Sequence, residues 1–175
     1  MKTKRILACL LCVLMLLSLV GCDKKTYGYS PADYLSKINI LCSDDFGVLT
    51  VKEKINPYTQ KIEISEKLHL ILHADTVTNT VQKAELVLTI DTETEKLDYS
   101  SFSYFFLIML KAYDEGISVG NINSIHDSLG VETYISGTDT QIGYGSNEYF
   151  YAVTESTATF TAQYNTPSAK DTVPY

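Results

Sequence analysis

Apolar and polar residues alternate in several short segments of this chain, which is the pattern of strands that have one buried and one solvent-exposed face. In Val81 to Asp91, residues 84, 86, 88 and 90 are apolar, while Lys83, Glu85 and Thr89 are on the other face. Residues 62–72 alternate in the same way, except near Ser65-Glu66, where the interruption predicts a bulge or a short break. The other predicted strands are Phe46 to Ile55, Val131 to Ser136, Gln141 to Tyr144, Glu148 to Thr154 and Thr157 to Tyr164.

Three further segments have apolar residues at helical spacing: 30–42, 98–116 and 120–129. Ser30 can cap the first helix, Asp98 or Ser100 can cap the second, and Gly130 can end the third. The second segment is apolar nearly all round, which predicts a helix in the centre of the core.

These elements follow in the order helix, three strands, two helices and four strands. We therefore expect an α+β fold in which an antiparallel β-sheet of about six to seven strands carries two to three helices. The order is compatible with one continuous sheet and with two αβ repeats. The single domain should cover residues 30–164, and residues 165–175, which are polar and contain two prolines, should form a loose tail.

The start of the chain has a different composition. Lys2, Lys4 and Arg5 precede an apolar run from Ile6 to Val20. This run is shorter than the roughly twenty residues that a spanning helix needs. A basic start followed by a short apolar core is typical of an export signal. An uncleaved membrane anchor and an ordinary signal peptide are the alternatives to the more specific interpretation that follows.

The next residues, Leu19-Val20-Gly21-Cys22, resemble the lipobox of bacterial lipoprotein precursors. The resemblance implies that residues 1–21 are removed as a signal peptide and that a diacylglyceryl group is attached to the Cys22 thiol. Two acyl chains anchor a protein stably to a membrane. The expected location is therefore the extracytoplasmic face of the cell membrane, with residues 22–29 as a lipidated tether that reaches about 25 Å at most.

The leader also changes the interpretation of the cysteines and of the charge. Cys9 and Cys12 lie inside the removed segment and Cys22 would carry lipid, so we expect Cys42 to be buried as a small hydrophobic residue. Loss of three basic residues with the leader moves the formal net charge from −7 to −10. This acidic balance argues against nucleic acid as a partner and against a polybasic contact with anionic lipids.

Side chains suited to catalysis are few and scattered. His69 and His73 lie four residues apart in a strand, where they share a face but are separated by about 13 Å, so they cannot bind one ion together. His126, Asp127 and Ser128 are adjacent on a helix, where successive side chains point about 100° apart, which excludes a relay among the three. A hydrolase would need these histidines to cluster with a carboxylate. We predict that the protein is not an enzyme and holds no cofactor or metal.

Two loops match ligand-binding motifs only in part. Carboxylates cluster between the third strand and the second helix, at Asp91, Glu93, Glu95 and Asp98. An EF-hand would need Gly and Glu where Lys96 and Phe102 stand. We interpret this loop as solvated and favourable to the positive end of the next helix, with a weak calcium site as the alternative. Gly143-Tyr144-Gly145 precedes a strand, which predicts a hairpin turn rather than a phosphate loop.

The last third of the domain is rich in tyrosine. Tyr144, Tyr149, Tyr151 and Tyr164 fall in neighbouring predicted strands and together suggest a binding face, because tyrosine joins an apolar ring to a polar tip. We expect a membrane-anchored extracytoplasmic lipoprotein that serves as a protein-binding or assembly module. The alternative is a domain that binds glycans or small ligands through these tyrosines.

Overall fold

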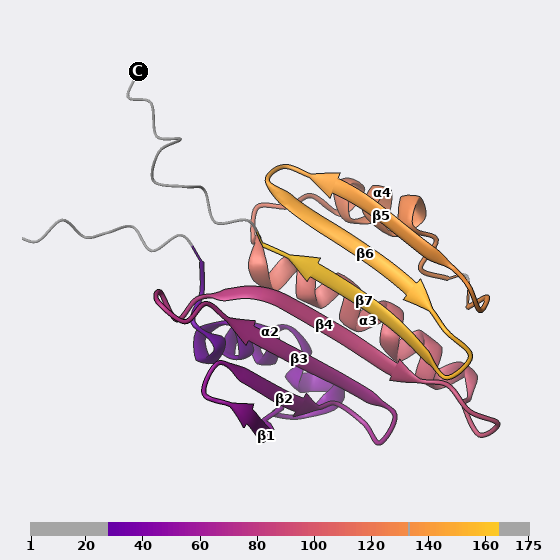
Figure 1. The fold of residues 1–175 in the computed structure, drawn as a ribbon, viewed down its shortest axis with the longest axis horizontal. Coiled ribbons are helices and arrows are strands. Elements are labelled where there is room, and N and C mark those ends of the chain that lie inside the picture. Colours follow the sequence, from indigo (N-terminus) through magenta and orange to yellow (C-terminus); the bar gives the residue numbers. More distant parts are fainter. Residues whose placement is uncertain (1–27, 133, 165–175) are drawn as a thin grey trace, which may run out of the picture.

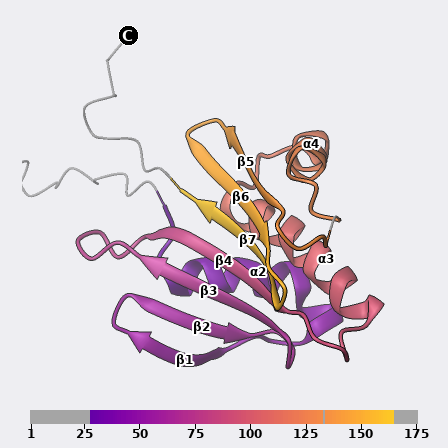
Figure 2. The same ribbon diagram turned by 45° about the vertical axis from the view of Figure 1, so that its right-hand side comes forward.

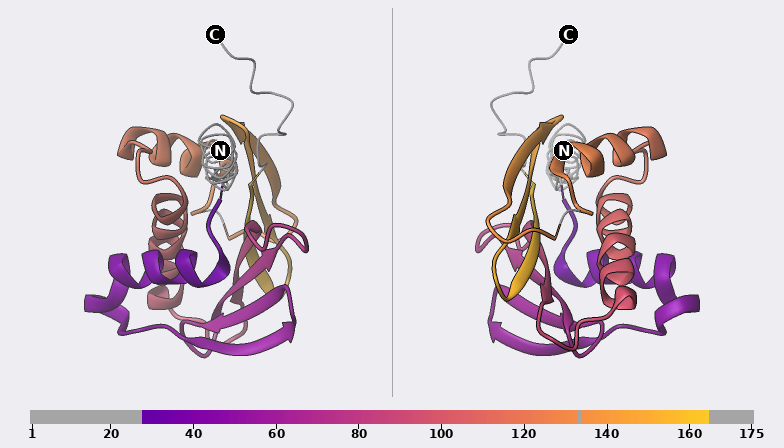
Figure 3. Two further views of the ribbon diagram at one scale, coloured as in Figure 1. Left: turned by 90° about the vertical axis from the view of Figure 1, so that its left-hand side faces the viewer. Right: turned by 90° about the vertical axis from the view of Figure 1, so that its right-hand side faces the viewer.

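The computed structural model describes residues 28–132 and 134–164. The predictions for Cys22, for most of its tether and for the tail 165–175 lie outside these residues. The described residues confirm an α+β class: a seven-stranded antiparallel sheet carries three helices (Figure 1). The three helices that the structure describes lie on the same side of the sheet, and its other face, called here the uncovered face, carries none of them (Figure 3).

The elements that the structure describes are α2 (Pro31–Phe46), β1 (Val51–Asn56), β2 (Thr59–Glu63), β3 (Leu68–Ala74), β4 (Val81–Thr89), α3 (Lys96–Tyr113), α4 (Val119–Leu129), β5 (Asp139–Tyr144), β6 (Asn147–Val153) and β7 (Thr157–Gln163). The strands are arranged in the order β1-β2-β3-β4-β7-β6-β5. Antiparallel pairing of β4 with β7 joins the two halves in the middle of the sheet (Figure 2). In this pairing Leu86 lies opposite Phe160. The sheet is therefore continuous, and the alternative of two separate αβ repeats is wrong.

The interruption at Ser65-Glu66 is a break between two strands, where the chain turns, and not a bulge within one strand. Residues 62–72 form parts of two strands, β2 and β3, because the N–H groups of Ile64 and Ser65 donate to the Leu68 carbonyl and reverse the chain. The first strands are thus a meander of four rather than three. Apolar alternation continues across the turn, which is why the sequence pattern resembles one long strand.

The prediction of a strand over Val131 to Ser136 is wrong. Gly130 adopts the left-handed conformation that ends α4, with φ 65°. The N–H of the next residue, Val131, donates to the His126 carbonyl in the last turn of the helix. The buried Val131 side chain therefore belongs to the helix termination, in which an apolar residue after the glycine packs back on the core.

Helix boundaries also differ from the prediction, and α3 ends at Tyr113 rather than at residue 116. The first helix, α2, continues past Cys42 to Phe46, whose ring packs against Phe105 at a centroid distance of 4.8 Å. Residue 46 is therefore helical rather than the start of a strand. The second helix, α3, begins at Lys96 because the Glu95 N–H donates to Asp98 Oδ2 at 2.8 Å in a capping box.

The core lies between the inner face of the sheet and the helices. The most completely buried large side chains are Tyr34, Ile38, Ile62, Leu68, Leu70, Leu72, Leu86, Phe102, Phe105, Phe106, Tyr151 and Phe160. Cys42 is 1% exposed, which confirms its expected role as a small hydrophobic residue. The expectation that α3 is buried all round was wrong in part, since its Leu107 is 36% exposed. No helix among the described residues is long and apolar enough to cross a membrane.

Candidate functional site

The tyrosine face predicted from the sequence does not form. Tyr149, Tyr151 and Tyr164 are 3%, 0% and 2% exposed, and they point from β6 and the end of β7 into the core. Tyr144 remains at the surface, where its hydroxyl accepts a hydrogen bond from Asn121. The alternation of the tyrosines marked the buried face of the strands, so a glycan-binding platform built from these four residues is excluded in this conformation.

One of the buried tyrosines belongs to a cluster at the end of the molecule where the described chain begins and finishes. Tyr34 donates to the Met109 carbonyl at 2.9 Å, and its oxygen lies 2.8 Å from that of Tyr164. The Tyr113 ring stacks on Tyr164 at 3.5 Å between centroids, and Tyr29 meets Tyr113 edge to face. Burial raises the pKa of Tyr34 and of Tyr164 above the usual value, so both hydroxyls stay protonated.

The three histidines are not brought together. His69 and His73 lie on the uncovered face of the sheet, whereas His126 is on α4 and packs against Phe106. His73 Nε2 lies 2.5 Å from Glu85 Oε2, and its Nδ1 lies 3.5 Å from the Thr59 hydroxyl. This set links β2, β3 and β4 across the sheet surface.

His69 and His126 have different surroundings. His69 Nδ1 is buried without a hydrogen-bond partner among the described residues, and burial, followed by the charge of Lys61, lowers its pKa. His126 Nδ1 is 3.5 Å from Asp127 Oδ1, a contact between neighbours that does not include Ser128. Neither histidine is part of a hydroxyl–imidazole–carboxylate relay in the described residues.

The acidic loop before α3 uses its carboxylates for its own structure. Asp91 accepts hydrogen bonds from Lys67 at 2.7 Å, from the Glu93 N–H and from the Thr94 hydroxyl, and these contacts lower its pKa. Asp98 closes the capping box of α3. Among the residues that the structure describes, no group of three or more His, Cys, Asp or Glu side chains is placed to hold a metal ion.

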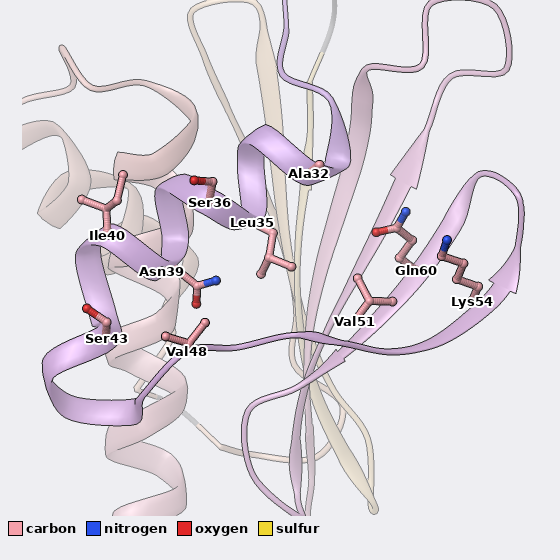
Figure 4. Close-up of a pocket in the computed structure, with 10 residues that line it drawn as sticks. All are labelled: Ala32, Leu35, Ser36, Asn39, Ile40, Ser43, Val48, Val51, Lys54 and Gln60. Carbon is pink, nitrogen blue, oxygen red and sulfur yellow. The ribbon is translucent and has the colours of Figure 1, made fainter.

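A candidate binding site is a groove of about 680 Å³ between α2 and the β1–β2 edge of the sheet (Figure 4). One wall is α2, and the floor is the inner face of β1 and β2 together with the connection between α2 and β1. The lining residues are Ala32, Leu35, Ser36, Asn39, Ile40, Ser43, Val48, Val51, Lys54 and Gln60. We call this site the α2–β1 groove.

The α2–β1 groove exists because the connection between α2 and β1 is held close under the helix. Gly47 ends α2 with φ 71° and turns the chain back. Asn39 then donates from Nδ2 to the Leu49 carbonyl at 2.9 Å and accepts the Leu49 N–H at Oδ1 at 2.8 Å. This two-point contact fixes the connection, with Leu49 buried and its neighbour Val48 exposed at the rim.

The α2–β1 groove is mostly apolar and contains a single charged side chain among its lining residues. Leu35 and Val51 point toward each other, and Lys54 and Gln60 rise from the strands toward the start of α2 (Figure 4). Lys54 makes no ion pair with any residue that the structure describes. Ile40 and Val48, which both line this groove, are 76% and 73% exposed.

The α2–β1 groove borders a free edge of the sheet. Among the described residues, β1 is paired with β2 alone, and five of the six residues of this first strand are exposed. The opposite edge strand, β5, is instead held against α4, where the Thr140 hydroxyl donates to the Leu129 carbonyl at 2.7 Å. The two edges of the sheet therefore differ in how well they are protected.

A second apolar hollow, of about 270 Å³, lies between the outer surfaces of α2, α3 and α4. Its lining includes Leu41, Leu107 and Val119, and Val119 is 72% exposed. It borders no free strand edge, so it offers apolar contact but no backbone hydrogen bonds.

The sequence patterns did not reveal the α2–β1 groove. Its residues come from the helix, the connection and the two edge strands, which the chain brings together only when β1 and β2 fold under α2. Ile40 was the available signal, because it lies outside the apolar face that Tyr34, Leu35 and Ile38 share. An apolar residue on the outer side of an amphipathic helix is a weak signal taken alone.

Comparisons of the chain with known protein families, with curated proteins and with solved structures find no match. Function is therefore inferred from the geometry of the described residues.

Proposed function

We propose that this protein is a lipid-anchored extracytoplasmic module that binds a segment of a partner protein in the α2–β1 groove. The observation that carries the proposal is the combination of an apolar groove with exposed Ile40 and Val48 and a free strand edge beside it. Exposed large apolar side chains around a concave site are the feature that distinguishes interaction sites from ordinary surface.

The membrane location is part of the proposal and is supported by the leader alone. The run Leu19-Val20-Gly21-Cys22 resembles a lipobox, and the described domain begins only a few residues later. Tyr29 is tied to the domain, because its carbonyl accepts the Val81 N–H at 2.8 Å. A Cys22-linked lipid would therefore hold this end of the domain within about 25 Å of the bilayer.

Anchoring is tested by mass and by fractionation. We expect the mature chain to begin at Cys22 with the mass of a diacylglyceryl group, and to sediment with membranes. Cys22→Ala should release it from the membrane fraction. A full-length chain with its first residues intact, or a Cys22→Ala protein that stays in the membrane, would overturn the lipid anchor.

Partner binding is tested with a photo-crosslinking amino acid at Val48, in the full chain and in the cells that produce it. Val119 is the matched control position, because it is also a valine, is exposed to nearly the same extent and lies outside the α2–β1 groove. We expect a discrete adduct of higher mass from position 48 and none from position 119. Ile40→Asp should remove the adduct while the protein still folds, since Ile40 is mostly exposed.

Two results would overturn the groove as the binding site. Absence of an adduct from position 48 would remove the support for a partner. An adduct from position 119 but not from position 48 would place the contact in the hollow between the helices instead.

A further inference from the structure

We infer that the occupant of the α2–β1 groove is an extended peptide segment that adds to the free edge of β1 as an eighth strand and places a carboxylate on Lys54. This inference rests on the proposed function and specifies the chemistry of the partner. Its three supports are the backbone of β1, the lining of the groove and the charge of Lys54.

The backbone of β1 offers hydrogen bonds along one side. A strand at the end of a sheet has N–H and C=O groups that its single neighbour does not use, and an added strand can pair with them. Strand β1 is six residues long, so it can pair with a segment of about 20 Å. Pairing with β2 shifts register at Lys52 and at Ile55, which limits the regular stretch and favours a short segment over a long sheet.

The α2–β1 groove offers separate contacts to the side chains of such a segment. Alternate side chains of a strand point to opposite faces, so every second residue of an added strand would face α2 and the groove. Leu35, Val48 and Val51 favour apolar residues at those positions. In recognition by strand addition, backbone hydrogen bonds generally supply the affinity, and a groove that contacts alternate side chains supplies the specificity.

Lys54 selects the charge of the partner. It is the one charged residue in the groove lining and has no ion pair among the described residues, whereas nearby Lys52 is paired with Glu63 at 3.4 Å. A carboxylate on the incoming segment would form an ion pair with Lys54. The same lysine would repel a segment that carries a basic residue at this position, which makes the edge selective.

A second copy of this chain fits the edge less well. Two copies of β1 paired antiparallel about a twofold axis at Lys52, Glu53 or Lys54 would set a charged residue opposite its own copy. Like charges directly opposite one another in a sheet are destabilising. The charge pattern of β1 therefore favours a different chain with an acidic residue.

The test uses the full-length chain in detergent and two blocked, fluorescent peptides of roughly nine residues, long enough to cover β1. Both peptides alternate valine with threonine, and one carries glutamate where the other carries lysine at the central groove-facing position. We expect the glutamate peptide to bind at least about fivefold more tightly, which corresponds to the roughly 1 kcal/mol of an exposed charge pair. Lys54→Glu should reverse this preference, and the matched control Lys96→Glu on α3 should leave it unchanged.

Strand addition is separated from other contacts by methylating the peptide backbone. N-methylation at alternate residues along one edge should weaken binding at least about tenfold, the effect of losing one or two hydrogen bonds. N-methylation at the intervening residues should have little effect, because their N–H groups face solvent. Amide hydrogen exchange in residues 51–56 should slow when the peptide binds.

The outcomes separate this inference from the proposed function. Equal effects of N-methylation at both sets of residues, unchanged exchange in β1, or no binding of either peptide at about 1 mM would overturn strand addition. If the adduct at position 48 still forms, partner binding in the groove stands without strand addition. Concentration-dependent dimers that protect β1 without peptide would replace the inferred partner by a second copy of the chain.

Discussion

The buried pair Tyr34 and Tyr164 allows a sharp test of the hydrogen bonds inside the core. Tyr34 donates its proton to the Met109 carbonyl, so the hydroxyl of Tyr164 must be the donor to the Tyr34 oxygen. Both side chains are at most 2% exposed, and water cannot replace a lost partner. The Tyr34 hydroxyl therefore takes part in two hydrogen bonds, whereas the Tyr164 hydroxyl takes part in the one that they have in common.

The expected loss of stability for each variant depends on which buried groups lose a hydrogen-bond partner. Tyr34→Phe removes the bond to Met109 and leaves the Tyr164 O–H buried without an acceptor, so we expect a loss of about 2 kcal/mol in the free energy of unfolding. Tyr164→Phe leaves the bond from Tyr34 to Met109 intact and should cost about 1 kcal/mol or less. The double variant has no hydroxyl left without a partner, so its cost should be smaller than the sum by about 1 kcal/mol.

Urea unfolding followed by circular dichroism measures the free energy of unfolding of the unaltered protein, the two single variants and the double variant. An unchanged m-value checks that the substitutions alter stability alone. Near-additive effects in the double variant would refute the reasoning, because they would mean that the two hydroxyls are not hydrogen-bonded to each other. A loss for Tyr164→Phe equal to or greater than that for Tyr34→Phe would refute the assignment of donor and acceptor.

Three further predictions concern other parts of the molecule. Because burial raises the pKa of Tyr34 and Tyr164 above 10, the folded state keeps protons that the unfolded state releases at high pH. The free energy of unfolding should therefore keep the whole contribution of these tyrosines below pH 10 and fall as pH rises further. Tyrosinate absorbance should appear together with unfolding, and its appearance in the folded protein near pH 10 would contradict this prediction. Asn39→Asp keeps the acceptor but loses the donor to Leu49, and thermal unfolding should show a loss of about 1 kcal/mol, whereas no change would contradict the role of Asn39 in holding the groove. Burial lowers the pKa of His69 below 6.5, so the contribution of neutral His69 to the free energy of unfolding should be complete above pH 6.5 and be lost as pH falls. His69→Gln should make stability less dependent on pH in this range, and an unchanged slope would contradict the assigned role of His69.

Several local signals in the sequence predicted the structure correctly. Ser30 caps α2 by accepting the Asp33 N–H, and Gly130 ends α4 in the left-handed conformation. The alternation in Thr157 to Tyr164 correctly predicted a strand whose side chains divide between two faces, because side chains on a strand have a period of two. The same period could not distinguish a turn from a bulge at Ser65-Glu66, since apolar residues resume in phase on the other side.

Tertiary contacts decided the remaining features. The pairing of β4 with β7, far apart along the chain, made one continuous sheet out of what could have been two units. The same pairing set the inner face of the last strands against α3, which buried Tyr149, Tyr151 and Tyr164 and removed the predicted tyrosine face. Alternation shows that residues share a face, but only the position of the helices determines which face is covered.

Patterns within single segments were enough to predict the α+β class, the type of most elements and the burial of Cys42, and they also predict a lipid anchor at Cys22. The position of the proposed binding site, in contrast, depends on how the elements pack. The α2–β1 groove needs the helix, the connection held by Asn39 and the strand edge at Lys54 to meet in space. These residues are separated along the chain and have no shared period, because a concave site depends on how elements pack rather than on the pattern within any one of them.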